Sequence, residues 1–208
     1  MSAGRPRAIG RAASVFGAIC AAWAVPAAAH PHIFIDYAAT ILCKNDAIAG
    51  VRVAWTFDEM YSASLFHDYT SRPKGPLGPA DVAQLKTGAF QDTAEQHYFT
   101  DVTLNGKPLP ITQVTDFDAS YDGRKMTYRF TVPLAIPLGR GAEILEIDSF
   151  DTEFYIDFGL VKKDPVEIQG NAPGLSCAPG SVLRHTTIFG PLATRIVRCR
   201  YERPALTE

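Results

Sequence analysis

Apolar and polar side chains alternate with a period of two along most of the chain, which is typical of half-buried strands. The first alternating run spans residues 32–43 and places on one face Ile33, Ile35, Tyr37, Ala39, Ile41 and Cys43. The run at 51–57 alternates in the same way, with Val51, Val53, Trp55 and Phe57 expected to point inward. Because only a short polar turn separates the two runs, they predict a β-hairpin.

Similar runs recur to the end of the chain, separated by turn residues such as Asn105–Gly106 and Asp122–Gly123. Seven to nine strands at this spacing favour a mainly β fold of the α+β class, an antiparallel β-sandwich or barrel. One region breaks the pattern. Residues of about 57–98 predict a two-helix insertion, the first helix with Thr56 as N-cap and Glu59 three residues later, the second opened by Pro79 and Asp81.

Residues 1–29 differ in kind from the rest. Arg5, Arg7 and Arg11 precede a stretch of small and apolar residues, and an A-x-A site ends at Ala29. This layout predicts a cleaved signal peptide. The expected mature chain is therefore one β-rich domain, residues 30–208, exported to the periplasm and beginning at His30. No later segment is apolar enough to predict a transmembrane span.

Net charge bears on the expected partners, and the cysteines bear on the expected disulfide. The predicted signal peptide contains three arginines and no acidic residue, so its removal takes the formal net charge from −2 to −5. A nucleic-acid partner is therefore not expected. The cysteines left after Cys20 are Cys43, Cys177 and Cys199, an odd number for an oxidising compartment. Position favours a Cys177–Cys199 disulfide with Cys43 reduced and buried, although Cys43 could instead pair with either.

The sequence His30–Pro31–His32 is a candidate metal site at the new amino terminus. The α-amine and imidazole of His30 can chelate one ion together, and His32 lies about 6.6 Å further along an extended chain. Pro31 has no N–H, which excludes the usual motif with deprotonated backbone amides. An amine and two imidazoles suit the divalent ions of zinc, nickel or copper. The alternative is a solvated chain end with no metal chemistry.

Carboxylates elsewhere could complete such a site. Asp58 and Glu59 open the first predicted helix, where their ordinary role is to cap the helix and favour its dipole. Asp151 lies among aromatic residues in the run SFDTEFYIDF and supplies a ligand if that strand ends near the amino terminus. No phosphate-binding loop, nucleophile elbow or H-E-x-x-H motif occurs, and no catalytic residues are assigned.

Several segments together resemble a bacterial family of unknown function, number 1007, described as an uncharacterised periplasmic component of an ABC-type transport system. These segments are AHPHIFID, GVRVAWTFDEMYSASLF, YFTDVTLNGKPL and DSFDTEFYIDFGL. The resemblance implies transition-metal handling beside a nickel, cobalt or zinc transporter, with His30, His32, Asp58, Glu59 and Asp151 at the family's motif positions. Many relatives carry an acidic, calcium-type loop between the helices, but HDYTSRPKGPLGPAD retains only Asp68 and Asp81.

Three functions are therefore compared. The first is an exported, non-enzymatic protein that binds a divalent transition metal and assists an inner-membrane metal permease or ABC-type transporter. The second is a structural or partner-binding periplasmic module without metal chemistry. The third is a copper histidine-brace oxidase similar to lytic polysaccharide monooxygenases, although their second histidine lies far along the chain.

Overall fold

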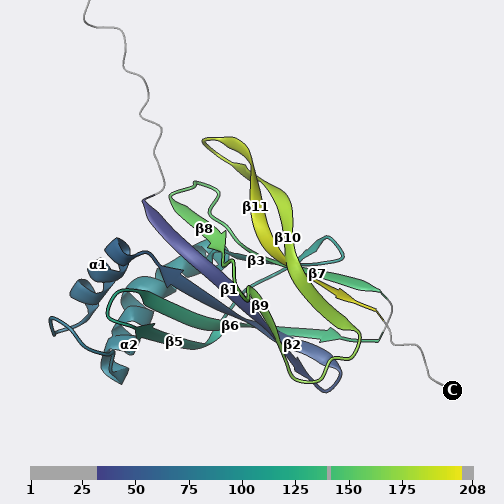
Figure 1. Cartoon of the computed structure of the whole chain (residues 1–208), viewed down its shortest axis with the longest axis horizontal. Helices are drawn as coiled ribbons and strands as arrows, with labels where there is room; N and C mark the ends of the chain where they lie inside the picture. The colour runs from purple at the N-terminus through teal and green to yellow at the C-terminus, as the bar shows by residue number, and fades with distance from the viewer. Residues whose placement is uncertain (1–31, 140–141, 203–208) are drawn as a thin grey trace, which may run out of the picture.

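Two β-sheets make up the body of the protein in the computed structural model, which describes residues 32–139 and 142–202 (Figure 1). Both sheets contribute side chains to one hydrophobic core. The β-sandwich with a helical insertion that the sequence predicts is therefore confirmed. The expected signal peptide, residues 1–29, and His30 lie outside the described residues. Within the described part of the chain, no helix is long and apolar enough to cross a membrane.

The first sheet has the strand order β5-β6-β2-β1-β8, and β9 also pairs with β1. Its strands are β1 (Ile33–Lys44), β2 (Ala47–Phe57), β5 (Thr115–Tyr121), β6 (Met126–Pro137), β8 (Ile156–Leu160) and β9 (Val166–Gln169). β1 and β2 form the expected antiparallel hairpin. The inward side chains predicted for the second run are buried, namely Val51, Val53, Trp55 and Phe57.

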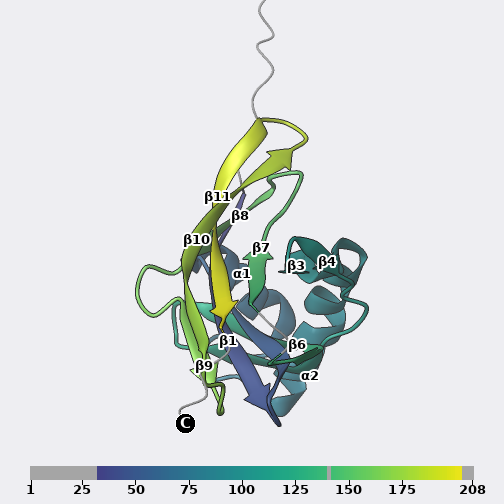
Figure 2. The ribbon, with the colours of Figure 1, turned by 90° about the vertical axis from the view of Figure 1, so that its right-hand side faces the viewer.

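The second sheet has the order β10-β11-β7-β3-β4, and all its pairings are antiparallel. Its strands are β3 (Thr100–Leu104), β4 (Lys107–Leu109), β7 (Glu143–Ser149), β10 (Leu175–Thr186) and β11 (Gly190–Tyr201). β10 and β11 form a long hairpin. Its turn end projects past β8 in both views (Figures 1 and 2).

β8 and β9 depart from the antiparallel pattern because both run parallel to β1. β8 pairs with the first part of β1, where Ile33 lies opposite Ile156, and β9 pairs with a later part, where Ala39 lies opposite Val166. The partners are far apart in the sequence, so no local pattern signals the pairing. As a consequence, the loop before β8 lies beside the start of β1.

The helical insertion covers the β5–β6 side of the sandwich. It contains α1 (Glu59–Tyr69), α2 (Pro79–Leu85), a π-helical turn (Lys86–Phe90) and a 3₁₀ segment (Gln91–Phe99). α1 packs against β6 and α2 against β5. Pro79 and Asp81 open α2 as expected. The predicted N-cap of α1, Thr56, is wrong: β2 continues through Phe57, and Asp58 is the cap.

Trp55 connects the two sheets at the centre of the core. Its ring packs against Phe130 and Phe158, with ring centroids 4.9 and 5.4 Å away. Its indole N–H donates to Ser149 Oγ on β7 at 3.2 Å. A buried indole N–H needs an acceptor, so this bond fixes the first sheet relative to the second.

Cys177 and Cys199 lie opposite each other in the β10–β11 register and form a disulfide, which confirms the predicted pairing. Cys43 is a free thiol. It is half-buried rather than fully buried as expected, and burial raises the pKa of its thiol. Disulfides persist in oxidising compartments, so this bond indicates an environment outside the cytoplasm.

A partly buried ion pair links β10 to β7 and β3 within the second sheet. Arg184 Nε on β10 donates to Asp148 Oδ2 at 2.7 Å, and Arg184 Nη2 lies 3.2 Å from Asp101 Oδ2. Asp148 and Asp101 are directly opposite on β7 and β3, so the guanidinium offsets the repulsion between two carboxylates. Asp148 is 2% exposed, and burial raises its pKa to about 6 although Arg184 lowers it.

The raised pKa predicts a pH-dependent contribution of Asp148 to stability. The folded-state pKa lies above the unfolded value, so this contribution, about 3 kcal/mol at most, is complete below about pH 4 and is lost as the pH rises through 6. The difference in unfolding free energy between wild type and Asp148→Asn should therefore decrease over that range. Urea denaturation at several pH values measures it. Asp92→Asn, an exposed change on the 3₁₀ segment away from this ion pair, is the control. Parallel curves for wild type and Asp148→Asn would contradict the assignment.

Removal of the disulfide should lower the free energy of unfolding by about 3 kcal/mol, the chain-entropy value for a loop of this length. The variant Cys177→Ala/Cys199→Ala tests this by urea denaturation at neutral pH. Cys43→Ala, which removes the thiol outside the bond, should change stability much less. A double variant as stable as the wild type would show that the bond adds nothing to the hairpin.

Candidate functional site

His32 lies directly before β1, and its side chain is exposed. Its ring packs against the ring of Tyr155, with 4.9 Å between centroids. Its backbone N–H donates to the carbonyl oxygen of Tyr155 at 2.9 Å. Both main chain and side chain of His32 are therefore held by one residue of the loop before β8.

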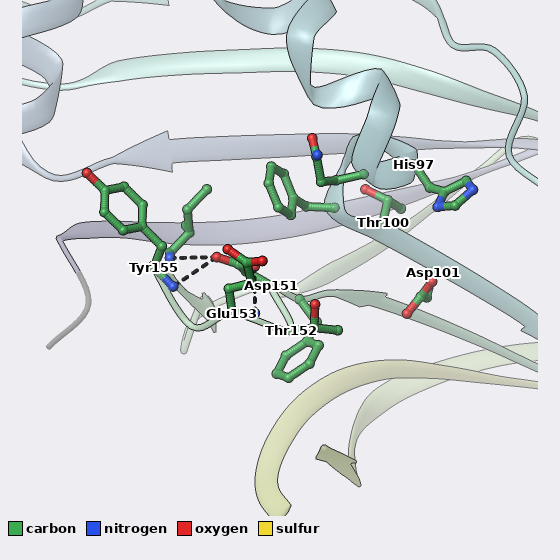
Figure 3. A pocket seen from close by; sticks show the side chains of 11 residues that line it. His97, Thr100, Asp101, Asp151, Thr152, Glu153 and Tyr155 are labelled. Carbon is green, nitrogen blue, oxygen red and sulfur yellow. Dashed lines mark hydrogen bonds between the residues drawn. The ribbon is translucent and has the colours of Figure 1, made fainter. Parts of the chain in front are cut away.

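Asp151 orders that loop. Its Oδ2 accepts the backbone N–H groups of Tyr155 and Ile156 at 2.9 and 3.0 Å, and its Oδ1 accepts the N–H of Glu153 at 3.0 Å (Figure 3). The side chain is buried, with 6% of Asp151 exposed. A carboxylate that accepts backbone N–H groups makes charge-assisted hydrogen bonds, which are stronger than neutral ones. Asp151 thus positions Tyr155 and, through it, His32.

Asp58 supports β1 from the other side. Its Oδ2 accepts the N–H of Phe34 at 3.0 Å, while its Oδ1 caps α1 through the N–H of Tyr61 at 2.9 Å. Its own N–H donates to the carbonyl of Phe34 at 2.9 Å. Asp58 therefore joins the beginning of α1 to the second residue of β1, two positions beyond His32.

The predicted ligand residues do not converge on one point. β2 and β8 lie on opposite sides of β1, so Asp58, which follows β2, and Asp151, which precedes β8, flank the strand. Glu59 pairs with Arg124, with Oε1 and Nη2 2.6 Å apart. In residues 32–139 and 142–202, no three His, Cys, Asp or Glu side chains are grouped to hold a metal ion. His30, the other predicted nitrogen donor, lies outside this part.

A cavity of about 420 Å³ lies beside Tyr155 and Asp151, between the loop before β8 and the beginning of β3. His97 and Asp101 lie across the cavity from Tyr155, and Glu153 lies next to Asp151 (Figure 3). His97 is the first of three consecutive residues with a left-handed backbone, at φ values of 52°, 55° and 42°. His97 is exposed, and the sequence pattern assigns no role to His97 or Tyr155.

In the loop between the helices, where the acidic calcium-type loop of relatives would lie, the charge of Asp81 is balanced by the side chain of Arg72. Arg72 Nη2 forms an ion pair with Asp81 Oδ2, and the same oxygen accepts the N–H of Gly78 at 2.6 Å. The Gly78 N–H, followed by Arg72, holds the pKa of Asp81 below its usual range. Asp68, the other carboxylate retained in this stretch, bonds His67 at 2.9 Å. The two carboxylates thus have protein partners.

Comparison with known proteins places the chain in a family. A family model described as "Protein of unknown function (DUF1007)" matches residues 15–182, and the chain belongs to this family. It is similar to an uncharacterized protein of Haemophilus influenzae, 26% identical over 141 residues, which cover 67% of this chain and 66% of that protein. The chain thus spans just under two-thirds of that relative's length.

A second similar protein is the "Uncharacterized 15.5 kDa protein in trpE 3'region" of Spirochaeta aurantia. It is 29% identical over 102 residues, which cover 49% of this chain and 72% of that protein. The names of both relatives state no activity.

The bonds of Asp151 predict that its loss releases the start of β1. Asp151→Ala should lower the free energy of unfolding by about 2–4 kcal/mol, because three N–H groups lose a charged acceptor. It should also speed hydrogen exchange of the His32 amide, since the Tyr155 carbonyl is no longer held in place. Glu153→Ala, an exposed change in the same loop, is the control. Unchanged exchange at His32 in Asp151→Ala would contradict the positioning role.

Proposed function

We propose that the protein is an exported periplasmic protein that binds one divalent transition metal ion, of zinc, nickel or copper, at its amino terminus and assists a membrane metal transporter. The donors are the α-amine and imidazole of His30 and the imidazole of His32. The observation that carries the proposal is the anchoring of His32. Its ring rests on Tyr155, and its N–H bonds the Tyr155 carbonyl, so an exposed imidazole is held at the beginning of β1.

The donor chemistry supports a borderline-soft ion. An amine and two neutral imidazoles are nitrogen ligands of the kind that zinc, nickel and copper prefer over calcium or magnesium. His30, which supplies the amine and the second imidazole in this proposal, lies outside the described residues. The Cys177–Cys199 disulfide supports location in an oxidising compartment, where a signal peptide ending at Ala29 would expose His30 as the first residue.

The three carboxylates predicted from the sequence as further ligands differ in how many bonds they already make within the protein. Asp151 already accepts three N–H groups, and Asp58 accepts two, so their negative charge serves first to hold the backbone around His32. Glu59 is exposed and pairs with Arg124. Among the three, Asp58 is tied most directly to the metal-binding strand end, through Phe34. The proposal therefore assigns Asp58 as the candidate oxygen ligand and Asp151 as a support.

The role beside a transporter rests on the family resemblance and on the exposed position of the site. An ion bound by the exposed side chain of His32, at the end of β1, remains accessible to a second protein. This accessibility suits transfer to a transporter better than permanent storage in a buried cage. The copper oxidase alternative is supported by no further observation.

The proposal predicts one divalent ion per protein whose affinity depends on the native start. His32→Ala should weaken binding at least tenfold, because one imidazole is lost. One extra residue before His30 should weaken it similarly, because the α-amine no longer chelates with that imidazole. Affinity should also fall as the pH is lowered, because protons compete with the metal ion for the nitrogen donors. Calorimetric titration with Zn(II), Ni(II) and Cu(II) measures these changes.

His185→Ala, which removes an exposed histidine on β10, is the matched control and should bind as the wild type does. The mass of the intact exported protein first establishes that the chain begins at His30. Equal affinities for native start, extended start and His32→Ala would refute the amino-terminal site and favour the partner-binding module without metal chemistry.

A further inference from the structure

One face of the β10–β11 hairpin changes from buried to uncovered along its length. Residues of this face pair across the hairpin as Cys177 with Cys199, Pro179 with Val197, Ser181 with Arg195, and Leu183 with Ala193. Cys199 and Val197 are fully buried at 0% exposure, whereas Ala193 is exposed and Leu183 is 75% exposed. The first sheet thus covers the hairpin near the disulfide and leaves it uncovered toward the turn.

The first sheet does not cover the turn end of the hairpin because it ends at β8, which pairs with β1 alone. Tyr155 and Val161 bond toward the β1 side: the Tyr155 carbonyl accepts the His32 N–H, and the Val161 N–H donates to Tyr37. Because peptide groups alternate in direction along a strand, those of Phe158 and Leu160 point away from β1. In the described part of the chain, no strand pairs with that side of β8.

A groove of about 720 Å³ lies along this free edge. One wall is β8 with the two residues that follow it, residues 157–162, and the other is residues 192–195 of β11. Tyr37 Oη donates to the carbonyl of Arg195 at 2.7 Å and so holds β11 beside the groove. The edge of β8 is five residues long, which corresponds to an extended segment of roughly 17 Å.

The charges in the groove are unevenly placed. Asp36 and Asp157 lie together in its lining, and the pKa of Asp157 is raised by burial first and then by the charge of Asp36. Lys162 and Arg195 also line the groove, but neither pairs with these carboxylates. Gly159, directly opposite Asp36 in the β1–β8 register and without a side chain, leaves the Asp36 carboxylate open beside the strand. A basic side chain fits this end.

We propose that the groove binds an extended segment of a partner polypeptide, which adds to the free edge of β8 as a further strand of the first sheet. The segment places an apolar side chain on Leu183 and Ala193 and a basic side chain beside Asp36 and Asp157. Unpaired N–H and C=O groups of Phe158 and Leu160 bond its backbone, the usual basis of strand addition. This site is separate from the amino-terminal metal site and does not depend on metal binding.

Selection of ten-residue peptides from a random displayed library on the purified, disulfide-bonded protein tests the proposal. Selected peptides should alternate apolar and polar residues and carry a basic residue. Their binding should slow hydrogen exchange at the amides of Phe158 and Leu160, which exchange quickly in the free protein. Ala193→Lys, which fills the groove, and Leu183→Ser, which removes the exposed apolar side chain opposite Ala193 in the hairpin, should each weaken binding at least tenfold.

Ala178→Lys is the matched control, because Ala178 is exposed on the opposite face of the same hairpin. It should bind the selected peptides as the wild type does. Failure to select any peptide, or peptides that bind Ala193→Lys normally, would overturn the proposal. Slow exchange at Phe158 and Leu160 in the free protein, together with a dimer that Ala193→Lys dissociates, would show instead that a second copy covers the edge. All these outcomes are independent of metal affinity.

Discussion

The buried carboxylate of Asp151 fixes the end of the molecule on which both proposed sites depend. Through Tyr155 it holds the ring and the backbone N–H of His32, and through Ile156 it sets the residue at which β8 begins. A buried charge is stable only when hydrogen bonds replace its hydration, and three backbone N–H groups do so here. One side chain therefore aligns the candidate metal-binding strand end and the free edge of the first sheet.

The two proposed sites lie on the same end of the sandwich but use different chemistry. The amino-terminal site relies on nitrogen donors that are exposed beside Tyr155, whereas the groove relies on unpaired peptide groups and an uncovered apolar face. A partner that adds a strand to β8 would lie next to the residues that hold His32. Partner binding would in this way bring a second protein close to a bound ion, as delivery to a transporter requires.

The sequence predicts the elements better than their pairing. The alternation through Val53 and Trp55 reports a local period, so the β1–β2 hairpin and its inward side chains follow from it. The parallel pairing of β8 with β1 joins distant segments, and no local pattern encodes it. Asp58 and Asp151 were identified by residue type as metal ligands, but their bonds to Phe34 and Tyr155 arise from chain crossings that only the fold creates. The same holds for the cavity that His97 lines.

The most direct test of the amino-terminal site is nuclear magnetic resonance of the ¹⁵N-labelled mature protein during addition of Cu(II) below one equivalent. A paramagnetic ion broadens the signals of nearby nuclei first. The amides of His32, Phe34 and Tyr155 should broaden before all others, and His32→Ala should abolish this pattern. Broadening centred on His97 or His185, or unchanged by His32→Ala, would contradict a metal site at the start of β1.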